Sequence, residues 1–257
     1  MNHGNLTATM KELMDNGAAS DFRDSRVLRI LSALAKVPQS TVRDIGETTG
    51  IPVSTVYRLV KLLVAFGFVQ KTSTRHYGAG PIAVQLAARY RDSTLATGSI
   101  TPYLRQLAQS SGELAAFMVA HSTEAVCVET VESNHTLRCS YSVGASQPLL
   151  RGATATVLLS RLDAQTRNEI YTFYDADVEV RTKCEQECSK TRSDGYAVSF
   201  GELDSGIWGV SAPVVDDGGN LRGAVTLMAP AERSVGRSRE LINSVRRTAE
   251  AMSGGII

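Results

Sequence analysis

The stretch from Thr41 to Gln70, TVRDIGETTGIPVSTVYRLVKLLVAFGFVQ, constrains the fold most, because it carries two helix signals with a tight bend between them. A threonine followed three residues later by Asp44 is typical of a capped helix start. Gly50 suits a helix end, where the backbone adopts a positive φ. Pro52 suits the first position of the next helix, because its missing N–H would have no partner there. The stretch therefore predicts two short helices joined by a bend.

The second of these helices should have two unlike faces. One face is apolar, because four residues recur at helical spacing: Val56, Leu59, Val60 and Leu63. The other face carries hydroxyls, one aromatic ring and two cations, with no acid among them. In a helix-turn-helix protein such a face enters the major groove and meets phosphates and base edges.

A basic wing is expected directly after this helix. The segment FVQKTSTRHYG reads as two short strands around a polar turn, which Lys71 and Arg75 flank. An ordinary helical hairpin shows similar spacing, so the pattern permits DNA binding without requiring it. The candidate DNA-contacting residues are Arg43, Ser54, Thr55, Tyr57, Arg58, Lys61, Lys71 and Arg75.

The charge of the 257-residue chain is unevenly spread. Residues 1–94 carry 12 Lys and Arg against 7 Asp and Glu, a net charge of +5, whereas residues 95–257 carry 15 against 19, a net charge of −4. A basic front half suits a module that binds phosphates. The N-terminus lacks the pattern of a secretion signal, and no apolar run has the roughly 20 residues of a membrane-spanning helix. We therefore expect a cytoplasmic protein.

The four cysteines offer little support for a metal site. Cys184 and Cys188 are four residues apart on a helical stretch, which is a possible spacing for two ligands. Neither a second cysteine pair nor a histidine at ligand spacing completes such a site. Buried free thiols are the preferred interpretation for these two residues, and we expect no metal and no cofactor.

The part of the chain after residue 98 predicts an α+β fold around a mainly antiparallel sheet. A helix ending at Gly112 precedes a pair of strands joined at Ser122–Glu124, with a third strand over residues 136–144. Helices are expected over 153–162, 164–174 and 181–193, and strands over 196–203, 207–216 and 221–230. A single helix over residues 232–253 should close the chain.

No enzyme motif stands out. The chain has no G-x-S-x-G, no phosphate-binding loop and no H-E-x-x-H, and its four histidines are scattered. An enzyme and a ligand-independent DNA-binding protein are the alternative classes. DNA affinity that does not respond to any ligand would favour the latter.

Several segments together resemble the IclR family of bacterial transcription regulators. SRVLRILSAL, IPVSTVYRLVKLLVAFGFVQ and YGAGP resemble its winged-helix reader, and GASQPLLRGATATVLL with the segment Arg192–Pro230 resembles its effector-binding domain. The resemblance covers residues 23–252 in the family's order. It implies a winged helix-turn-helix domain (21–81), a linker helix (82–97) and a GAF-like effector domain (98–257). Residues 1–20 lack periodicity, which predicts a flexible arm. It also implies a homodimer or homotetramer that binds double-stranded operator DNA and a small effector.

The resemblance further implies effector contacts from the helix start after the PL motif, the strand after GYA and the last strand. The positions carried over are Gly152, Ala153, Thr154, Ser199, Ile207, Gly209, Thr226 and Met228. The family's PLHATAxGKA reads PLLRGATATV here, so Leu150 replaces the histidine, while Ala155 and Thr156 replace the Gly-Lys pair. Ser199 stands at a position that is often acidic.

These departures predict a less polar pocket, in which Gly209 leaves space for the effector. We expect an aromatic or similarly bulky carboxylic acid to fit better than glyoxylate or pyruvate. Its carboxylate would lie at the helix start near Gly152, where free N–H groups favour anions. Arg151 reads as a surface residue or a ligand contact, and Phe200 and Trp208 as pocket or core.

Overall fold

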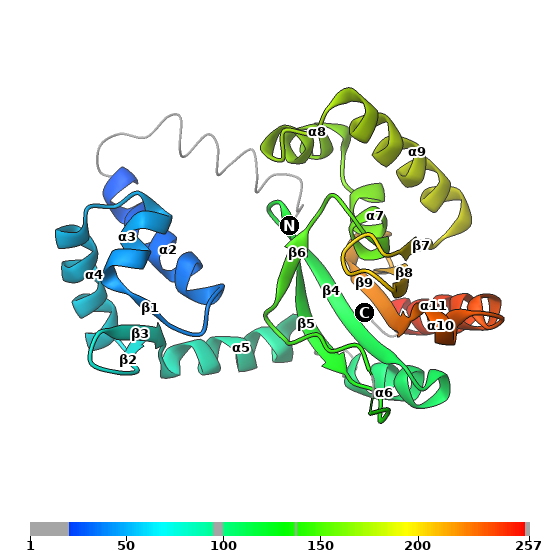
Figure 1. The fold of residues 1–257 in the computed structure, drawn as a ribbon, viewed down its shortest axis with the longest axis horizontal. Coiled ribbons are helices and arrows are strands. Elements are labelled where there is room, and N and C mark those ends of the chain that lie inside the picture. Colours follow the sequence, from blue (N-terminus) through cyan, green and yellow to red (C-terminus); the bar gives the residue numbers. More distant parts are fainter. Residues whose placement is uncertain (1–20, 95–99, 137, 255–257) are drawn as a thin grey trace. The chain divides into compact units, whose positions relative to one another are not determined.

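The computed structural model describes residues 21–94, 100–136 and 138–254, so the arm expected over residues 1–20 lies outside the described residues. Contacts divide the described residues into two compact units, one of residues 21–94 and the other of residues 100–136 and 138–254. Figure 1 shows the helices and strands of both, and each unit is described by itself below. We call the first the reader unit and the second the regulator unit, after the roles that the resemblance implies for them.

The reader unit combines helices with a small antiparallel sheet of strand order β1-β3-β2. Its described elements are α2 (Asp21–Ala35), β1 (Ser40–Thr41), α3 (Val42–Thr49), α4 (Val53–Ala65), β2 (Val69–Lys71), β3 (His76–Ala79) and α5 (Pro81–Thr94). Side chains from α2, α3 and α4 form its core around Ile30, Ile45 and Val60, which are almost fully buried. This unit therefore has a hydrophobic core of its own.

Local signals in the sequence set the ends of α3. The Thr41 hydroxyl accepts a hydrogen bond from the Asp44 N–H at 3.2 Å, and the Asp44 carboxylate accepts one from the Thr41 N–H at 3.0 Å. This reciprocal pair confirms the expected cap. Gly50 ends the helix with φ +65°. Pro52 occupies the N-cap of α4 rather than the expected first helical position, so the helix begins at Val53, one residue later than predicted.

The regulator unit is built on one curled sheet. Among the described residues, its strands run in the order β6-β5-β4-β9-β8-β7, and every neighbouring pair is antiparallel. The strands are β4 (Leu114–His121), β5 (Glu124–Val131), β6 (Ser146–Pro148), β7 (Ala197–Phe200), β8 (Ile207–Val215) and β9 (Leu221–Pro230). The helices are α6 (Ile100–Ser111), α7 (Ala153–Ser160), α8 (Ala164–Phe173), α9 (Val178–Asp194), α10 (Ala231–Ser234) and α11 (Ser238–Ser253).

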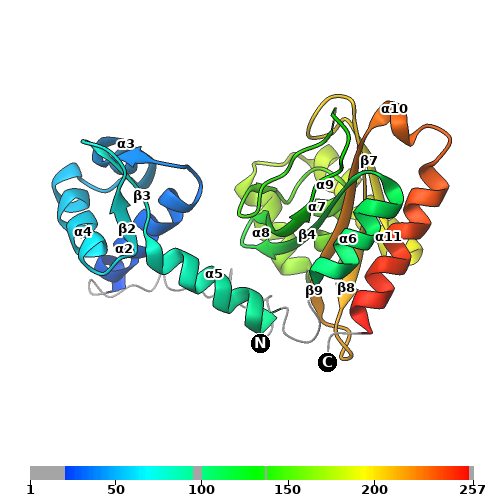
Figure 2. The same cartoon turned by 90° about the horizontal axis from the view of Figure 1, so that it is seen from below.

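Helices cover both faces of this sheet (Figure 2). Helices α6 and α11 pack on one face, and α7 packs on the other, with α9 against it. Side chains alternate between the faces along each strand. Thus Leu227 lies on the α11 side, while Thr226 and Met228 lie on the α7 side, which we call the inner face.

Three expectations for this unit were wrong in detail. Residue 136 and residues 138–144 form no strand; the edge strand is β6, which the segment reaches after a turn at Gly144 (φ +85°). The closing helix is split into α10 and α11, because Val235 leaves the helical conformation and Gly236 has φ +73°. The strand after Tyr196 ends at Phe200 rather than at residue 203, and the residues that follow form a loop.

Candidate DNA-binding surface and effector site

Helix α4 has the two faces that the sequence predicts. Val56, Val60 and Leu63 are buried, whereas the opposite face is open to solvent. Of the five predicted contact residues on this helix, Thr55 is half-buried, and the rest are exposed: Ser54, Tyr57, Arg58 and Lys61. No acidic residue occurs on α4. The exposed face therefore offers hydroxyls and cations to a groove without any like-charge repulsion from its own helix.

The side chains of Tyr57 and Lys61 contact one another on this face. The Lys61 ammonium lies 4.7 Å above the centre of the Tyr57 ring, within the range of a cation–π contact. The two residues are one turn apart, so their side chains point the same way. The contact holds a positive charge and an aromatic edge together at one point of the surface.

Arg43 is a weaker candidate than the residues of α4. It lies on α3, where its guanidinium Nε is 2.9 Å from a carboxylate oxygen of Glu47, four residues further along. Both side chains are exposed, and such pairs add little to stability. Because Glu47 offsets its charge, Arg43 contributes less positive potential than an unpaired arginine would.

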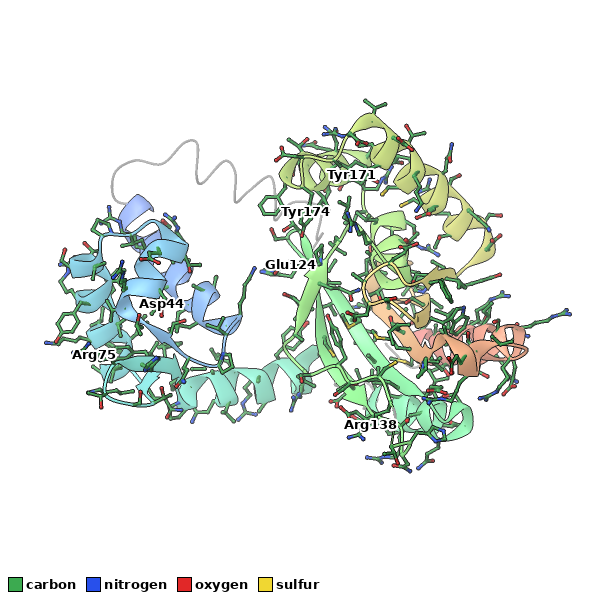
Figure 3. The ribbon with its side chains drawn as sticks, in the orientation of Figure 1. Asp44, Arg75, Glu124, Arg138, Tyr171 and Tyr174 are labelled. Atoms are coloured by element: carbon green, nitrogen blue, oxygen red, sulfur yellow. The ribbon has the colours of Figure 1, made fainter. Side chains whose placement is uncertain are left out.

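The wing is the β2–β3 hairpin. Val69 to Lys71 pair with Ala79 to Tyr77, and the turn lies over residues 72–75. Lys71 and Arg75 are both exposed; Figure 3 shows Arg75 on the reader unit. At the base of the turn the Ser73 hydroxyl lies 2.9 Å from His76 Nδ1. The structure therefore presents two cations on a braced turn.

Three buried hydroxyls meet on the inner face of the regulator sheet. Thr154 Oγ1 lies 2.8 Å from Thr226 Oγ1 and 3.2 Å from Ser211 Oγ, and the latter two oxygens are 2.8 Å apart. These residues are 2%, 2% and 0% exposed. Thr154 and Thr226 were predicted as effector contacts. Ser211 was missed, although its spacing of two from Gly209 on one strand places both on the same face.

The start of α7 is not open. Gly152, its N-cap, has φ +91°, and its N–H donates to Glu202 Oε2 at 2.8 Å. A Cβ at Gly152 would lie 3.0 Å from Leu203 Cδ1. Ala153, the first helical residue, is buried. Two residues of the β7–β8 loop therefore cover the helix end at which we expected the effector carboxylate.

The other predicted contacts lie on the inner face of the sheet. Ser199, Gly209 and Met228 are opposite one another across β7, β8 and β9. A Cβ at Gly209 would be 3.2 Å from Ser199 Oγ. The serine hydroxyl thus takes part of the volume that we expected glycine to leave open. Ile207, two residues before Gly209 on β8, packs against the inner core.

Strand alternation places two aromatic residues on the other side of the sheet. Phe200 pairs with Trp208, and both are one position out of phase with Ser199 and Gly209. Trp208 is buried, and Phe200 is exposed. Arg151, just before the α7 cap, is also exposed. None of these three joins the buried hydroxyl cluster.

The cysteines are free and buried, as predicted for Cys184 and Cys188. Burial raises the pKa of the Cys127 and Cys188 thiols to about 12, so both stay protonated at neutral pH. Among the described residues, no group of three or more His, Cys, Asp and Glu side chains could hold a metal ion. Nor is any helix among them long and apolar enough to cross a membrane.

Polar contacts hold α8 against α9 along a surface groove of about 540 Å³. Arg167 Nε and Nη2 donate to the two carboxylate oxygens of Glu185 at 2.7 and 3.0 Å, and the Tyr171 hydroxyl donates to Glu185 at 3.0 Å. Figure 3 labels Tyr171 between these helices. Hydrogen bonds to Arg167 and Tyr171 hold the pKa of Glu185 below its usual value. The groove is therefore braced by its own side chains.

Two family models match the chain. The family model of the IclR helix-turn-helix domain matches residues 25–73, and that of the bacterial transcriptional regulator IclR C-terminal domain matches residues 90–254. The glycerol operon regulatory protein of Streptomyces griseus is 29% identical over 240 residues, which cover 90% of this chain and 93% of that protein.

Solved structures share the fold. A putative IclR transcriptional regulator from Silicibacter sp. TM1040 superposes with a TM-score of 0.82 at 18% identity, covering 91% of this chain and 97% of that one. An IclR homologue from Microbacterium hydrocarbonoxydans, solved in complex with 4-hydroxybenzoate, has a TM-score of 0.72 at 18% identity and covers 91% and 98%.

Proposed function

This chain belongs to the IclR family of bacterial transcriptional regulators, and from that membership we propose that it binds operator DNA through α4 and the wing under control of an aromatic or similarly bulky carboxylic acid. Its relatives are regulators of transcription rather than enzymes. We place it in the cytoplasm, where both the DNA and the products of catabolism are found.

The exposed, acid-free face of α4 carries the DNA-binding proposal. Thr55, Tyr57 and Arg58 approach base edges or flanking phosphates in the major groove, and an arginine pairs best with guanine. Lys61 adds charge beside them. From the wing, Lys71 and Arg75 reach phosphates of the adjoining backbone, which strengthens binding to any sequence. Arg43 and Ser54 complete the proposed surface as phosphate contacts.

The chemistry of the inner face supports an acid as the effector. The effector carboxylate accepts hydrogen bonds from the backbone N–H groups at the start of α7, from Gly152 to Thr154. Ser199 and Thr226 supply hydroxyls, and the apolar end of the effector lies near Ile207 and Met228 beside Gly209. The IclR homologue that was solved in complex with 4-hydroxybenzoate supports an aromatic acid as the effector. Burial of the cluster favours a ligand with more apolar surface than glyoxylate offers.

We also propose a dimer formed through residues 21–94, which the regulator units can double into a tetramer. One α4 helix reads only half a site, and two symmetric readers gain affinity by pairing half-sites. The reader unit exposes large apolar side chains that its own core does not use: Leu28 on α2, and Val84 and Leu86 on α5. Sedimentation of a monomer that still binds its operator tightly at micromolar concentration would contradict this assembly.

Replacing Arg58 by alanine tests the reading surface. Fluorescence anisotropy against DNA from the chain's own upstream region should show a loss of about 1–3 kcal/mol for the best site, with relaxed specificity at one base pair. Arg239→Ala, the same charge change on an exposed position of α11, should leave binding unchanged. If Arg58 touches phosphate alone, all sequences weaken alike. Unaltered operator affinity would remove Arg58 from the interface.

Calorimetry with a panel of acids tests the effector class. Benzoate and 4-hydroxybenzoate should bind the full chain more tightly than glyoxylate or pyruvate, and binding should shift operator affinity. Tight binding of the small oxo acids, with no response to any aromatic acid, would refute the effector class while leaving the DNA-binding proposal intact.

A further inference from the structure

The loop between β7 and β8 is short and has a glycine at each end. It runs from Gly201 to Gly206, whose φ angles are +63° and +78°. Glycine adopts such angles without steric cost. Hydrogen bonds tie both ends of the loop: the Gly201 N–H donates to the Ile207 carbonyl at 2.8 Å, and the Ala231 N–H donates to the Gly206 carbonyl at 2.8 Å. We call residues 201–206 the flap.

The flap makes two contacts with the start of α7. Glu202 Oε2 accepts the Gly152 N–H at 2.8 Å, and Leu203 Cδ1 lies against the space above the Gly152 Cα. A negative charge here is favourable because the N-terminus of a helix carries partial positive charge. Leu203 is still 45% exposed, so this cover buries little apolar surface of its own.

We infer that Glu202 and Leu203 are a built-in stand-in for the effector, which an acid must displace in order to bind. This inference rests on the proposed function, since it names how that same site selects its ligand. Glu202 supplies a carboxylate at the helix end and Leu203 an apolar group beside it. Together they present the two chemical features of a bulky apolar acid, covalently tethered at its site.

An effector carboxylate cannot accept the Gly152 N–H while Glu202 accepts it. That N–H donates to Glu202 Oε2 at 2.8 Å, and the Leu203 side chain lies over the same residue. The incoming acid must therefore replace Glu202 at Gly152, and the flap must open.

The stand-in makes Glu202 and Leu203 specificity-determining residues. A small oxo acid replaces only the Glu202 carboxylate with its own, and it leaves empty the space that the Leu203 side chain occupied. An aromatic acid replaces both groups and adds apolar contact with the inner face. Since the apparent Kd equals the intrinsic Kd divided by the fraction of open protein, a closed flap weakens every acid and leaves only bulky ones with sufficient affinity.

The experiment measures 4-hydroxybenzoate, benzoate and glyoxylate against the full-length wild type, Glu202→Gln and Asp204→Asn by calorimetry. Glu202→Gln removes the competing charge and should lower the Kd of all three acids by about five- to tenfold, which corresponds to the difference between a charge-assisted and a neutral hydrogen bond. Asp204→Asn is the matched control: it removes one charge from the same flap, and its Kd values should stay within about twofold of wild type. Equal affinities of wild type and Glu202→Gln would overturn the inference, as would equal gains in both variants.

Hydrogen exchange in the ligand-free protein separates this inference from the effector class. The Gly152 amide should exchange faster in Glu202→Gln than in Asp204→Asn, because only the former loses its carboxylate acceptor. If no variant binds any acid, the proposed effector class fails; equal protection of Gly152 in both variants would then show that the stand-in contact is absent as well.

Discussion

Replacing Thr226 by valine should destabilise the regulator unit by about 2 kcal/mol. Valine has nearly the shape of threonine, so no cavity forms, and the change removes only a hydroxyl that is 2.8 Å from both Thr154 and Ser211. Each such hydrogen bond contributes about 1 kcal/mol net. The two remaining hydroxyls are 3.2 Å apart and keep one bond between them, so neither is left fully without a partner.

The triple variant Thr154→Val, Ser211→Ala, Thr226→Val sharpens this test. With all three hydroxyls gone, no buried polar group lacks a partner, and the loss should be smaller than for Thr226→Val alone. Urea unfolding followed by fluorescence of Trp208, the single tryptophan of the chain, reports on the regulator unit alone. A loss below about 0.5 kcal/mol for Thr226→Val, or a triple variant less stable than the single one, would refute the reasoning.

Three further outcomes are expected. Thr41→Ala should lower the stability of the reader unit by about 1 kcal/mol in thermal unfolding. Hydrogen bonds from Thr41 lower the pKa of Asp44. The stabilisation by this cap is therefore present at neutral pH and is lost as the pH falls through that lowered pKa. Tyr141→Phe should stabilise the regulator unit by about 1 kcal/mol in urea, because its buried hydroxyl has no partner among the described residues; a destabilised variant would contradict this. Gly209→Leu should force the Ser199 side chain aside and weaken effector binding in calorimetry, with effector-free operator affinity unchanged.

The reader unit could be predicted closely because its signals are local. Thr41 and Asp44 are three residues apart, and Gly50 ends the helix that they start. The apolar spacing of α4 assigned its buried face correctly without knowledge of what packs against it. In such a segment, the residues that determine the start, the end and the buried face of a helix lie within the helix or next to it in the sequence.

The regulator site depends instead on contacts between distant parts of the chain. Glu202 lies 50 residues from Gly152, and Thr154 lies 57 residues from Ser211, so no spacing rule links them. The end of β7 decides the first contact: a strand continuing to residue 203 would have carried Glu202 along the sheet edge. The sequence over 136–144 alternates as a strand does, yet β6 takes the position beside β5. Hydrogen bonding to β5, rather than the alternation of apolar residues, therefore decides which segment forms the edge strand.

The attachment of α5 determines how the reader unit can respond. The Ile82 N–H donates to the Gly67 carbonyl at 3.1 Å, and the Gly80 N–H donates to the Phe68 carbonyl at 2.9 Å. A Cβ at Gly80 would be only 2.2 Å from the Gly67 carbonyl oxygen, so only glycine permits this approach. The start of α5 is therefore fixed to the end of α4 and the base of the wing. Since the reader unit also has its own core, any force on α5 must move α4 and the wing together as one body. In the dimer that we propose, regulation would therefore change the position of the proposed recognition surface relative to the second copy, and not the folding of the surface itself.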